Sequence, residues 1–382
     1  MTAFDDATDG DTHVALTADR AMPAAGSSVS VVAPARLHLG FLDPSGTLGR
    51  RFGSLGMMID GMSTAVRMRA GGVAHGEDDN RVDAAPQARH EMARARRLVR
   101  HLQSATGRSE PIDMKLTEAL PPHVGLGSGT QLALALGRAF SELHGLGLDT
   151  PGIANLLDRG ARSGIGIAGF DRGGVLLDGG PRSGRQAPPV LARFDFPPEW
   201  RVILVQDPAR SGLHGDSEKQ GMARLPHFER ARAAHLCHLV LMQILPAVAE
   251  ADFGPFAAGL SELQAIVGEY FAPAQGGVYT SPAVGRLLRW IGEHHEAAIG
   301  QSSWGPTAFA ILPSEARARR MLESARAAGV VDAGLVTGIV AGRNQGARVT
   351  RGAQVTGNTG IAGDARLTGD VRITRGARDA GA

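Results

Sequence analysis

The segment 125–130, Gly-Leu-Gly-Ser-Gly-Thr, combines glycines and hydroxyl residues at a spacing typical of a loop that binds phosphate. The glycines permit positive φ and let the backbone approach a ligand, and the hydroxyls add donors. The apolar run 131–143 is predicted to be a helix, whose free N–H groups would point at the same place. The residues expected to contact phosphate are Gly125, Gly127, Ser128, Gly129 and Thr130. By itself the segment fits either this anion-binding role or a tight turn with a serine cap. It is not a Walker A loop, because the chain contains no Gly-Lys-Ser or Gly-Lys-Thr.

The elements that must position this loop follow an α/β order. Residues 28–33 and 65–69 have strand character, and 86–106 carries apolar residues at helical spacing with arginines on the other face. A short strand at 112–117 then leads into the glycine loop. Residues 46–61 are rich in glycine and are predicted to be a loop. The order strand, glycine loop, helix is the one that a phosphate site requires.

The second half of the chain is predicted to form a mixed sheet with helices. A helix is expected to begin near residues 149–151 and to stop near Gly164. Strands are expected at 200–206, 307–312 and 336–340, and helices at 222–248, 256–270, 282–294 and 314–328. Together these elements predict an α+β fold, a two-layer α/β sandwich. We expect a flexible leader at 1–27, two lobes at 28–185 and 186–350, and a flexible glycine-rich tail at 351–382.

Composition excludes several classes of function. A net charge of only +2 and 4% aromatic residues argue against a nucleic-acid-binding protein. A single cysteine, Cys237, excludes an intrachain disulfide, and its apolar surroundings predict a buried thiol. No run reaches the roughly 20 apolar residues of a membrane span, and the acidic first residues do not resemble a secretory signal, so we expect a cytoplasmic protein. His235 and His238 could form a metal pair, but packing on a helix surface is the favoured interpretation.

Three segments resemble, in order and approximate spacing, the three motifs of the GHMP kinase superfamily. They are Ala-Pro-Ala-Arg-Leu-His-Leu-Gly at 33–40, Pro-His-Val-Gly-Leu-Gly-Ser-Gly-Thr at 122–130, and Ser-Ser-Trp-Gly-Pro-Thr at 302–307. The resemblance implies a ribosomal-protein-S5-like N-terminal lobe, a ferredoxin-like C-terminal lobe and a ligand between them. It also removes most of the case for a simple turn at 125–130.

Within that superfamily, residues from about 28 to 350 resemble the β-ribofuranosylaminobenzene 5′-phosphate synthases, a family of methanopterin-pathway transferases. The segments that carry the resemblance are 36–43, 162–166, 170–174, 178–180, 212–218, 301–307 and 343–348. The resemblance implies that phosphoribosyl pyrophosphate donates its ribosyl phosphate to a small aromatic acid. The acid would be 4-aminobenzoate or 4-hydroxybenzoate, and the other products pyrophosphate and CO2.

Such a transferase must neutralise the departing pyrophosphate and hold the benzoate carboxylate, which is work for cations and Mg²⁺. Arg36 and Arg162 lie within the resembling motifs, and they either grip phosphate or carboxylate or form surface ion pairs. His38 and His214 either orient the aryl hydroxyl or amine or cap loops. We therefore expect catalytic roles for these four residues and Mg²⁺ as the cofactor.

Three aspartates, Asp43, Asp171 and Asp178, compete for a metal or acid–base role. Asp171 follows the second motif, where many GHMP kinases carry the base that acts on the accepting hydroxyl, so it is included among the catalytic candidates. Asp178 is either a metal ligand or a turn residue. The remaining predicted substrate contacts are Asp43, Ser163, Glu218, Ser302, Ser303, Trp304, Gly305 and Thr307.

Two other functions compete with the transferase: an ATP-dependent small-molecule kinase and a non-catalytic ligand sensor of the same fold. Bulky Trp304 and rigid Pro306 would reshape the third loop, which favours the transferase over the kinase. The intact glycine loop and the charged motifs argue against the sensor. The sequence does not separate the two acceptors, and it leaves the oligomeric state open, with a homodimer among the options.

Overall fold

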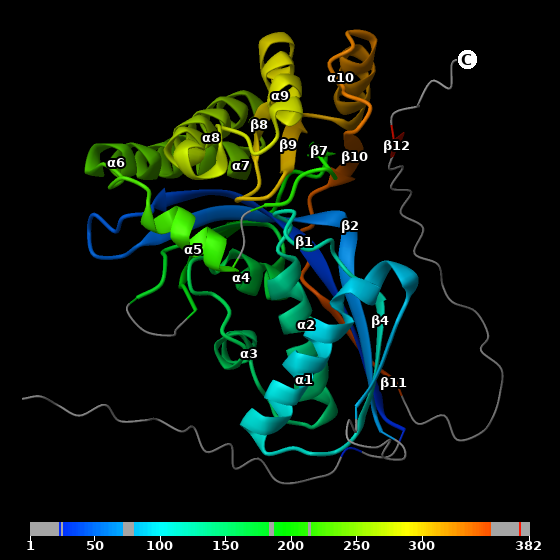
Figure 1. Cartoon of the computed structure of the whole chain (residues 1–382). Coiled ribbons are helices and arrows are strands. Elements are labelled where there is room, and N and C mark those ends of the chain that lie inside the picture. Colours follow the sequence, from blue (N-terminus) through cyan, green and yellow to red (C-terminus); the bar gives the residue numbers. More distant parts are fainter. Residues whose placement is uncertain are drawn as a thin grey trace, which may run out of the picture.

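The computed structural model describes residues 23, 26–71, 80–182, 187–212, 215–352 and 374–375, which form two sheets with helices packed against them (Figure 1). In chain order the first half contains β1 (Ser28–Asp43), β2 (Phe52–Ala70), β3 (Arg81–Ala84), a 3₁₀ helix (Pro86–Glu91), α1 (Met92–Thr106), β4 (Ile112–Glu118), α2 (Ser128–Leu143), α3 (Thr150–Leu156), α4 (Ile165–Arg172) and β5 (Val175–Asp178).

The second half begins with β6 (Val190–Phe194), which still belongs to the first sheet. It continues with β7 (Arg201–Gln206), α5 (Gly215–Ala223), α6 (Arg230–Leu239), a π-helical turn (Val240–Ile244), α7 (Leu245–Glu250), α8 (Phe253–Gln275), α9 (Pro282–His294), β8 (Ala298–Gln301), β9 (Thr307–Leu312), α10 (Glu315–Ala327), β10 (Val336–Ala341), β11 (Arg348–Gly352) and β12 (Thr374–Arg375).

The first sheet has the order β11-β1-β2-β4-β3, and β5 joins β2 to β6; the second has the order β12-β10-β7-β9-β8. Because β6 pairs with β5, and β11 returns to pair with β1, the sheets do not divide the chain at residues 185/186. The strand β11 also extends to Gly352, so the chain is still paired where the tail was predicted to begin. Most of the predicted leader and most of the predicted tail lie outside the described residues.

The prediction of a loop at 46–61 is confirmed for residues 46–51 and wrong for 52–61, because β2 already begins at Phe52. Residues 52–59 are buried without a break, so they lack the alternation of apolar and polar residues by which strands are recognised. Close packing explains one of the glycines of this segment, Gly56. A Cβ at Gly56 would lie 2.6 Å from Ile165 Cγ2 and 2.7 Å from the carbonyl oxygen of Leu37, so glycine lets α4 pack closely on the sheet.

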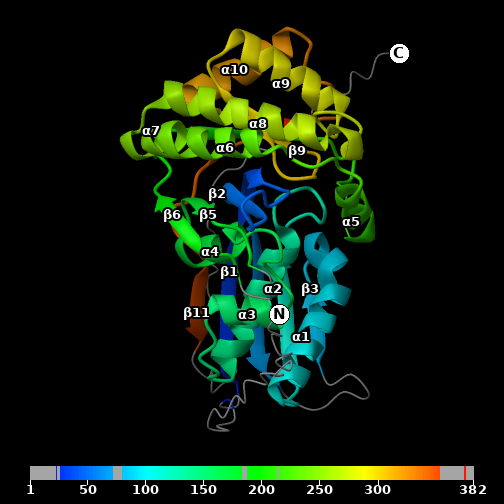
Figure 2. The ribbon, with the colours of Figure 1, turned by 90° about the vertical axis from the view of Figure 1, so that its left-hand side faces the viewer.

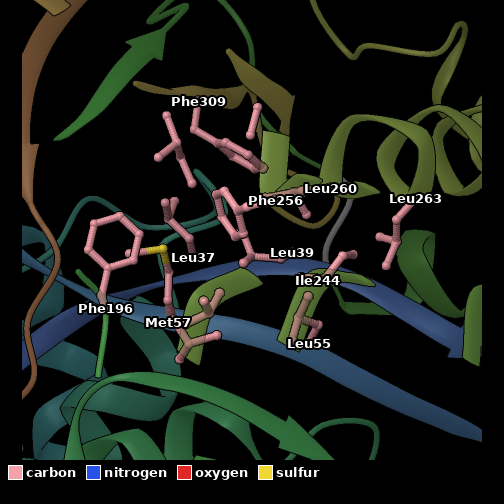
Figure 3. Close-up of a cluster of buried hydrophobic side chains, with 14 of the residues drawn as sticks. Leu37, Leu39, Leu55, Met57, Phe196, Ile244, Phe256, Leu260, Leu263 and Phe309 are labelled. Carbon is pink, nitrogen blue, oxygen red and sulfur yellow. The ribbon is translucent and has the colours of Figure 1, made fainter. Parts of the chain in front are cut away.

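The main core joins the two lobes. Leu37 and Leu39 of β1, with Leu55 and Met57 of β2, face residues of α8 and of the second sheet that include Phe256, Leu260, Leu263 and Phe309 (Figure 3). Figure 2 shows α6, α7 and α8 lying across one end of these strands, while α1 and α2 lie beside the other end. The lobes therefore share one apolar interior, which fixes the loops at their junction relative to one another.

The predicted helix 222–248 is divided into α5, α6, a π-helical turn and α7. Among the described residues, Arg230–Glu250 is long and apolar enough to span a membrane by length and composition alone. Leu236 and Ile244 of this stretch are fully buried in the main core, and 44% of its most apolar window is buried. The prediction of a buried Cys237 is wrong, since the residue is exposed.

A second predicted helix is also divided. The helix predicted to run to Gly164 ends at Leu156, and α4 follows as a separate helix.

Candidate functional site

Two residues of the glycine loop at 125–130 adopt left-handed conformations that favour glycine. Gly125 has φ +90° and Gly127 has φ +77°, and α2 begins directly after them at Ser128. A Cβ at Gly127 would lie 2.7 Å from Cγ of Arg36. The backbone N–H of Arg36 donates to the carbonyl of Leu126 at 3.1 Å. The first motif therefore lies directly against the glycine loop at the N-terminal end of a helix, where anions are favoured.

The three motifs that resemble the superfamily meet at one point. The Ser302 hydroxyl donates to the Gly125 carbonyl at 2.7 Å and accepts the backbone N–H of His38 at 2.9 Å. Gly305 packs so closely that a Cβ there would lie 2.2 Å from the carbonyl carbon of Val124. Segments about 90 and 265 residues apart in sequence are thus joined in one site by hydrogen bonds.

A cavity of about 500 Å³ opens above this junction. The predicted phosphate-binding residues Gly125, Gly127, Ser128, Gly129 and Thr130 line it, and so do Arg36, Glu218, Ser303, Trp304 and Gly305. Glu218 comes from α5, so this residue of the motif at 212–218 lies beside the other three motifs. The roles of these residues stay predictions, but the structure brings them together.

Arg36 is the cation held most firmly in this cavity. Its Nη1 donates to the Gly125 carbonyl at 3.1 Å. Burial lowers the pKa of Arg36 to about 10, against an opposing effect of Glu218, so the guanidinium stays charged near neutral pH. Arg162 forms an ion pair with Glu218 and reaches the cavity through that carboxylate.

Sequence reasoning missed two further arginines that line the cavity: Arg94 of α1 and Arg159, which follows α3. A Cβ at Gly129 would lie 3.6 Å from Nη1 of Arg94 and 4.0 Å from Nη1 of Arg159. The sequence interpretation gave all arginines of 86–106 to the solvent face. That holds for exposed Arg97, but the side chain of Arg94 is only 27% exposed and points at the start of α2.

A second, small cavity of about 20 Å³ adjoins the first, and Ser303 and Trp304 line both. Its wall includes the rings of His38, Phe41 and Phe271. The Nε2 atom of His38 and the Nε1 atom of Trp304 are buried there without a hydrogen-bond partner among the described residues. Burial, and secondly the charge of Arg36, hold the pKa of His38 well below its usual range, so the imidazole is neutral at pH 7.

Several predicted site residues lie elsewhere or bond to other protein groups. Asp43 accepts the backbone N–H groups of Gly46 at 2.8 Å and Thr47 at 2.6 Å, so it closes the turn between β1 and β2. Asp171 accepts the Thr150 hydroxyl at 2.5 Å and lines a separate cavity of about 570 Å³ rather than the one at the glycine loop. Asp171 therefore lies outside the lining of the cavity at the glycine loop, and its role as a base stays a prediction.

Thr307 is fully buried in β9, where its hydroxyl accepts from Gln206 at 3.2 Å. Ser163 donates to Asp178 at 3.2 Å. Both side chains therefore bond within the protein, as the hydroxyl of Ser302 also does. His214 lies outside the described residues.

The predicted metal ligand Asp178 bonds to other protein groups in this structure. Asp178 uses its oxygens to accept the backbone N–H groups of Gly164 at 2.8 Å and Gly180 at 2.9 Å, besides Ser163, and burial raises the pKa of this carboxyl despite those hydrogen bonds. Among the described residues that line the cavity at the glycine loop, the acidic side chain is that of Glu218, and it is paired with Arg162. The part of the chain that the structure describes contains no group of three metal-ligating side chains, and His235 pairs with Glu262 instead.

Comparisons with known proteins place this geometry in a class. Residues 93–174 match the GHMP kinases N terminal domain, and residues 244–331 match the GHMP kinases C terminal domain. Homoserine kinase from Cytophaga hutchinsonii superposes with a TM-score of 0.58 at 16% identity, covering 85% of this chain and 97% of that one. Mevalonate diphosphate decarboxylase from Staphylococcus aureus superposes with a TM-score of 0.58 at 11% identity, covering 85% and 98%. The protein therefore has the GHMP kinase fold, as the sequence predicted.

Two relatives narrow the class. The β-ribofuranosylphenol 5′-phosphate synthase of Archaeoglobus fulgidus is 36% identical over 297 residues, which cover 74% of this chain and 87% of the relative. The protein of the same name from Methanothermobacter thermautotrophicus is 30% identical over 296 residues, covering 73% and 87%. The chain belongs to the GHMP kinase superfamily and, within it, to the β-ribofuranosylphenol 5′-phosphate synthase family. It is an enzyme of the glycosyltransferase type. The similarity to these relatives confirms the family predicted from the motifs.

Proposed function

We propose that this enzyme transfers ribosyl 5-phosphate from phosphoribosyl pyrophosphate to a para-substituted benzoate, with release of pyrophosphate and CO2, in tetrahydromethanopterin biosynthesis. The observation that carries the proposal is the pair of adjoining cavities. One is cationic and built on a glycine loop, the other is aromatic, and Ser303 and Trp304 line both. A reaction between a phosphorylated sugar and an aromatic ring needs these two environments side by side.

On the donor side, the bond from the ribose C1 to the diphosphate oxygen breaks while negative charge gathers on the diphosphate. The N-terminal end of α2 and the guanidinium of Arg36 are fixed in advance where that charge develops, and fixed dipoles and cations of this kind stabilise a transition state. Arg36 is held by the Gly125 carbonyl, so little reorganisation is needed at the moment of reaction.

On the acceptor side, C1 bonds to the ring carbon that carries the carboxylate. The bond to the carboxylate then breaks, and its electron pair restores the aromatic ring as CO2 leaves. We propose that the ring lies against Trp304 with its para substituent directed at the small cavity, whose volume of about 20 Å³ suits one polar group. The unpartnered Nε2 of His38 and Nε1 of Trp304 would bond that group.

We favour 4-hydroxybenzoate over 4-aminobenzoate as the acceptor. Trp304 Nε1 can only donate a hydrogen bond, and a hydroxyl oxygen accepts one more readily than an aryl amine. The names of the relatives, which specify a phenol, agree with this choice.

We also propose that the enzyme uses Mg²⁺, that it is cytoplasmic, and that it binds neither nucleic acid nor membranes. Its oligomeric state stays open, and a homodimer is one option. Mg²⁺ is commonly bound through one or two carboxylates together with substrate phosphates. We therefore propose that it enters with the phosphates of the donor, since the described residues offer no separate cage.

Product analysis tests the proposal. The protein is incubated with phosphoribosyl pyrophosphate, Mg²⁺ and each benzoate, and the products are identified by mass spectrometry, beside a reaction in which ATP replaces the donor. We expect a riboside phosphate that has lost the mass of CO2, and no ADP. A phosphorylated acceptor with ADP would instead establish the kinase alternative.

A further inference from the structure

The phosphate cavity contains more positive charge than one phosphate group requires. Arg36 lies beside Gly127, and Arg94 and Arg159 lie beside Gly129. Of the described side chains that line this cavity, only Glu218 is acidic, and it is engaged with Arg162. Neither Arg94 nor Arg159 belongs to a motif that carried the family resemblance.

Arg94 is held in place rather than free to swing. Its Nη1 lies 3.2 Å from Oε1 of Glu91, whose side chain is only 4% exposed. A nearly buried carboxylate at this distance fixes the direction of the guanidinium and still leaves most of its five donors available. An anchored arginine of this kind is suited to recognise an anion of defined shape.

Arg159 lies close enough to Arg94 for the two charges to repel. Burial, and secondly the charge of Arg94, lower the pKa of Arg159, while exposed Asp158 opposes this. Its Nε is buried without a partner among the described residues. Two guanidinium groups brought together at a half-buried position destabilise each other unless an anion lies between them.

We infer that Arg94 and Arg159 form a second anion position beside the glycine loop, which holds the outer phosphate of a diphosphate group while the loop and Arg36 hold the inner one. The inference deepens the proposed function and rests on it for the identity of the natural donor. Binding of diphosphate itself follows from the two adjacent sets of donors, since each set can coordinate one phosphate.

The test compares inorganic pyrophosphate with orthophosphate by isothermal titration calorimetry on the full-length protein. The variants are Arg94→Gln and Arg159→Gln, and the control is Arg97→Gln, which removes an exposed arginine from the same helix. We expect the unmodified protein to bind pyrophosphate at least about tenfold more tightly than orthophosphate, because only pyrophosphate reaches both positions.

Each site variant should weaken pyrophosphate binding at least about fivefold and orthophosphate binding less than about twofold, while the control changes neither. If Arg94→Gln does not fold because Glu91 loses its partner, Arg94→Lys and Arg159→Gln carry the test. Equal losses for both anions, or no loss for either, would overturn the inference. Pyrophosphate binding that depends on the pair, in a protein that releases no CO2 from any benzoate, would refute the proposed transferase and leave the inference standing.

Discussion

Replacing Gly127 by alanine tests how the glycine loop and Arg36 act together. Gly127 has φ +77°, a left-handed conformation that costs an alanine about 1 kcal/mol. The new Cβ would also lie 2.7 Å from Arg36 Cγ, whereas ordinary contacts begin at 3.4 Å. Arg36 must therefore move by 3.4 − 2.7 = 0.7 Å, away from the position in which its Nη1 bonds the Gly125 carbonyl.

This displacement should weaken donor binding strongly. A charge-assisted hydrogen bond contributes roughly 1.5–3 kcal/mol, so the loss of one between Arg36 and a phosphate corresponds to about 10- to 100-fold in Kd. Gly145→Ala is the matched control, because Gly145 has φ +62°, no atom within 4 Å of its Cβ position, and lies beyond the other end of α2.

Both variants should lose about 1 kcal/mol of unfolding free energy, measured by chemical denaturation, since both place alanine at positive φ. Gly127→Ala should lose more than Gly145→Ala, because its Cβ also displaces Arg36. Only Gly127→Ala should lose affinity for phosphoribosyl pyrophosphate, measured by calorimetry. Similar donor affinities in the two variants would refute the argument that Arg36 needs the space above Gly127.

Three further predictions concern single side chains. Trp304→Phe removes the Nε1 donor but keeps a ring, so KM for 4-hydroxybenzoate should rise about 3- to 10-fold in steady-state kinetics while donor affinity changes less than about twofold; a larger effect on the donor would contradict the assigned position of the ring. Asp171→Asn should leave kcat within about twofold, because Asp171 lines a different cavity, whereas a kinase that used it as base would be inactivated. Because the pKa of His38 is lowered in the folded protein, the unfolded chain takes up a proton near pH 6.5 and the folded protein does not. The free energy of unfolding should therefore fall by up to about 1.4 kcal/mol per pH unit below about pH 6.5. Denaturation at several pH values should show this slope reduced in His38→Gln, and an unchanged slope would assign it to other groups.

Local sequence was enough to predict the elements whose pattern is uninterrupted. The helix 282–294 and the strand 307–312 have the predicted bounds, and the glycine loop does precede a helix. The beginning of β2 was missed because burial on both faces removes the alternation that signals a strand. The split of 222–248 into separate helices was also missed, since periodicity over a long apolar stretch does not reveal a π-helical turn.

The candidate site was partly predictable for a similar reason. Residues inside the motifs, such as Arg36 and Trp304, could be selected because each motif is continuous in sequence. Arg94 and Arg159 could not, because they reach the cavity only through the packing of α1 and the loop after α3 against α2. Conversely, Asp43 and Asp178 lie within the motifs, which made them candidates for a metal or acid–base role. Their oxygens accept backbone N–H groups, and the sequence alone does not reveal these hydrogen bonds.

The most direct test of the proposed function measures CO2 and pyrophosphate in the same reaction. Carboxyl-labelled 4-hydroxybenzoate is incubated with the protein, phosphoribosyl pyrophosphate and Mg²⁺, and labelled CO2 is counted beside an enzymatic assay for pyrophosphate. The proposed transfer predicts that the two products appear together in equal amounts and that neither forms when ATP replaces the donor. ADP formed in proportion to the acceptor, with no labelled CO2, would contradict the proposal and identify the protein as a kinase.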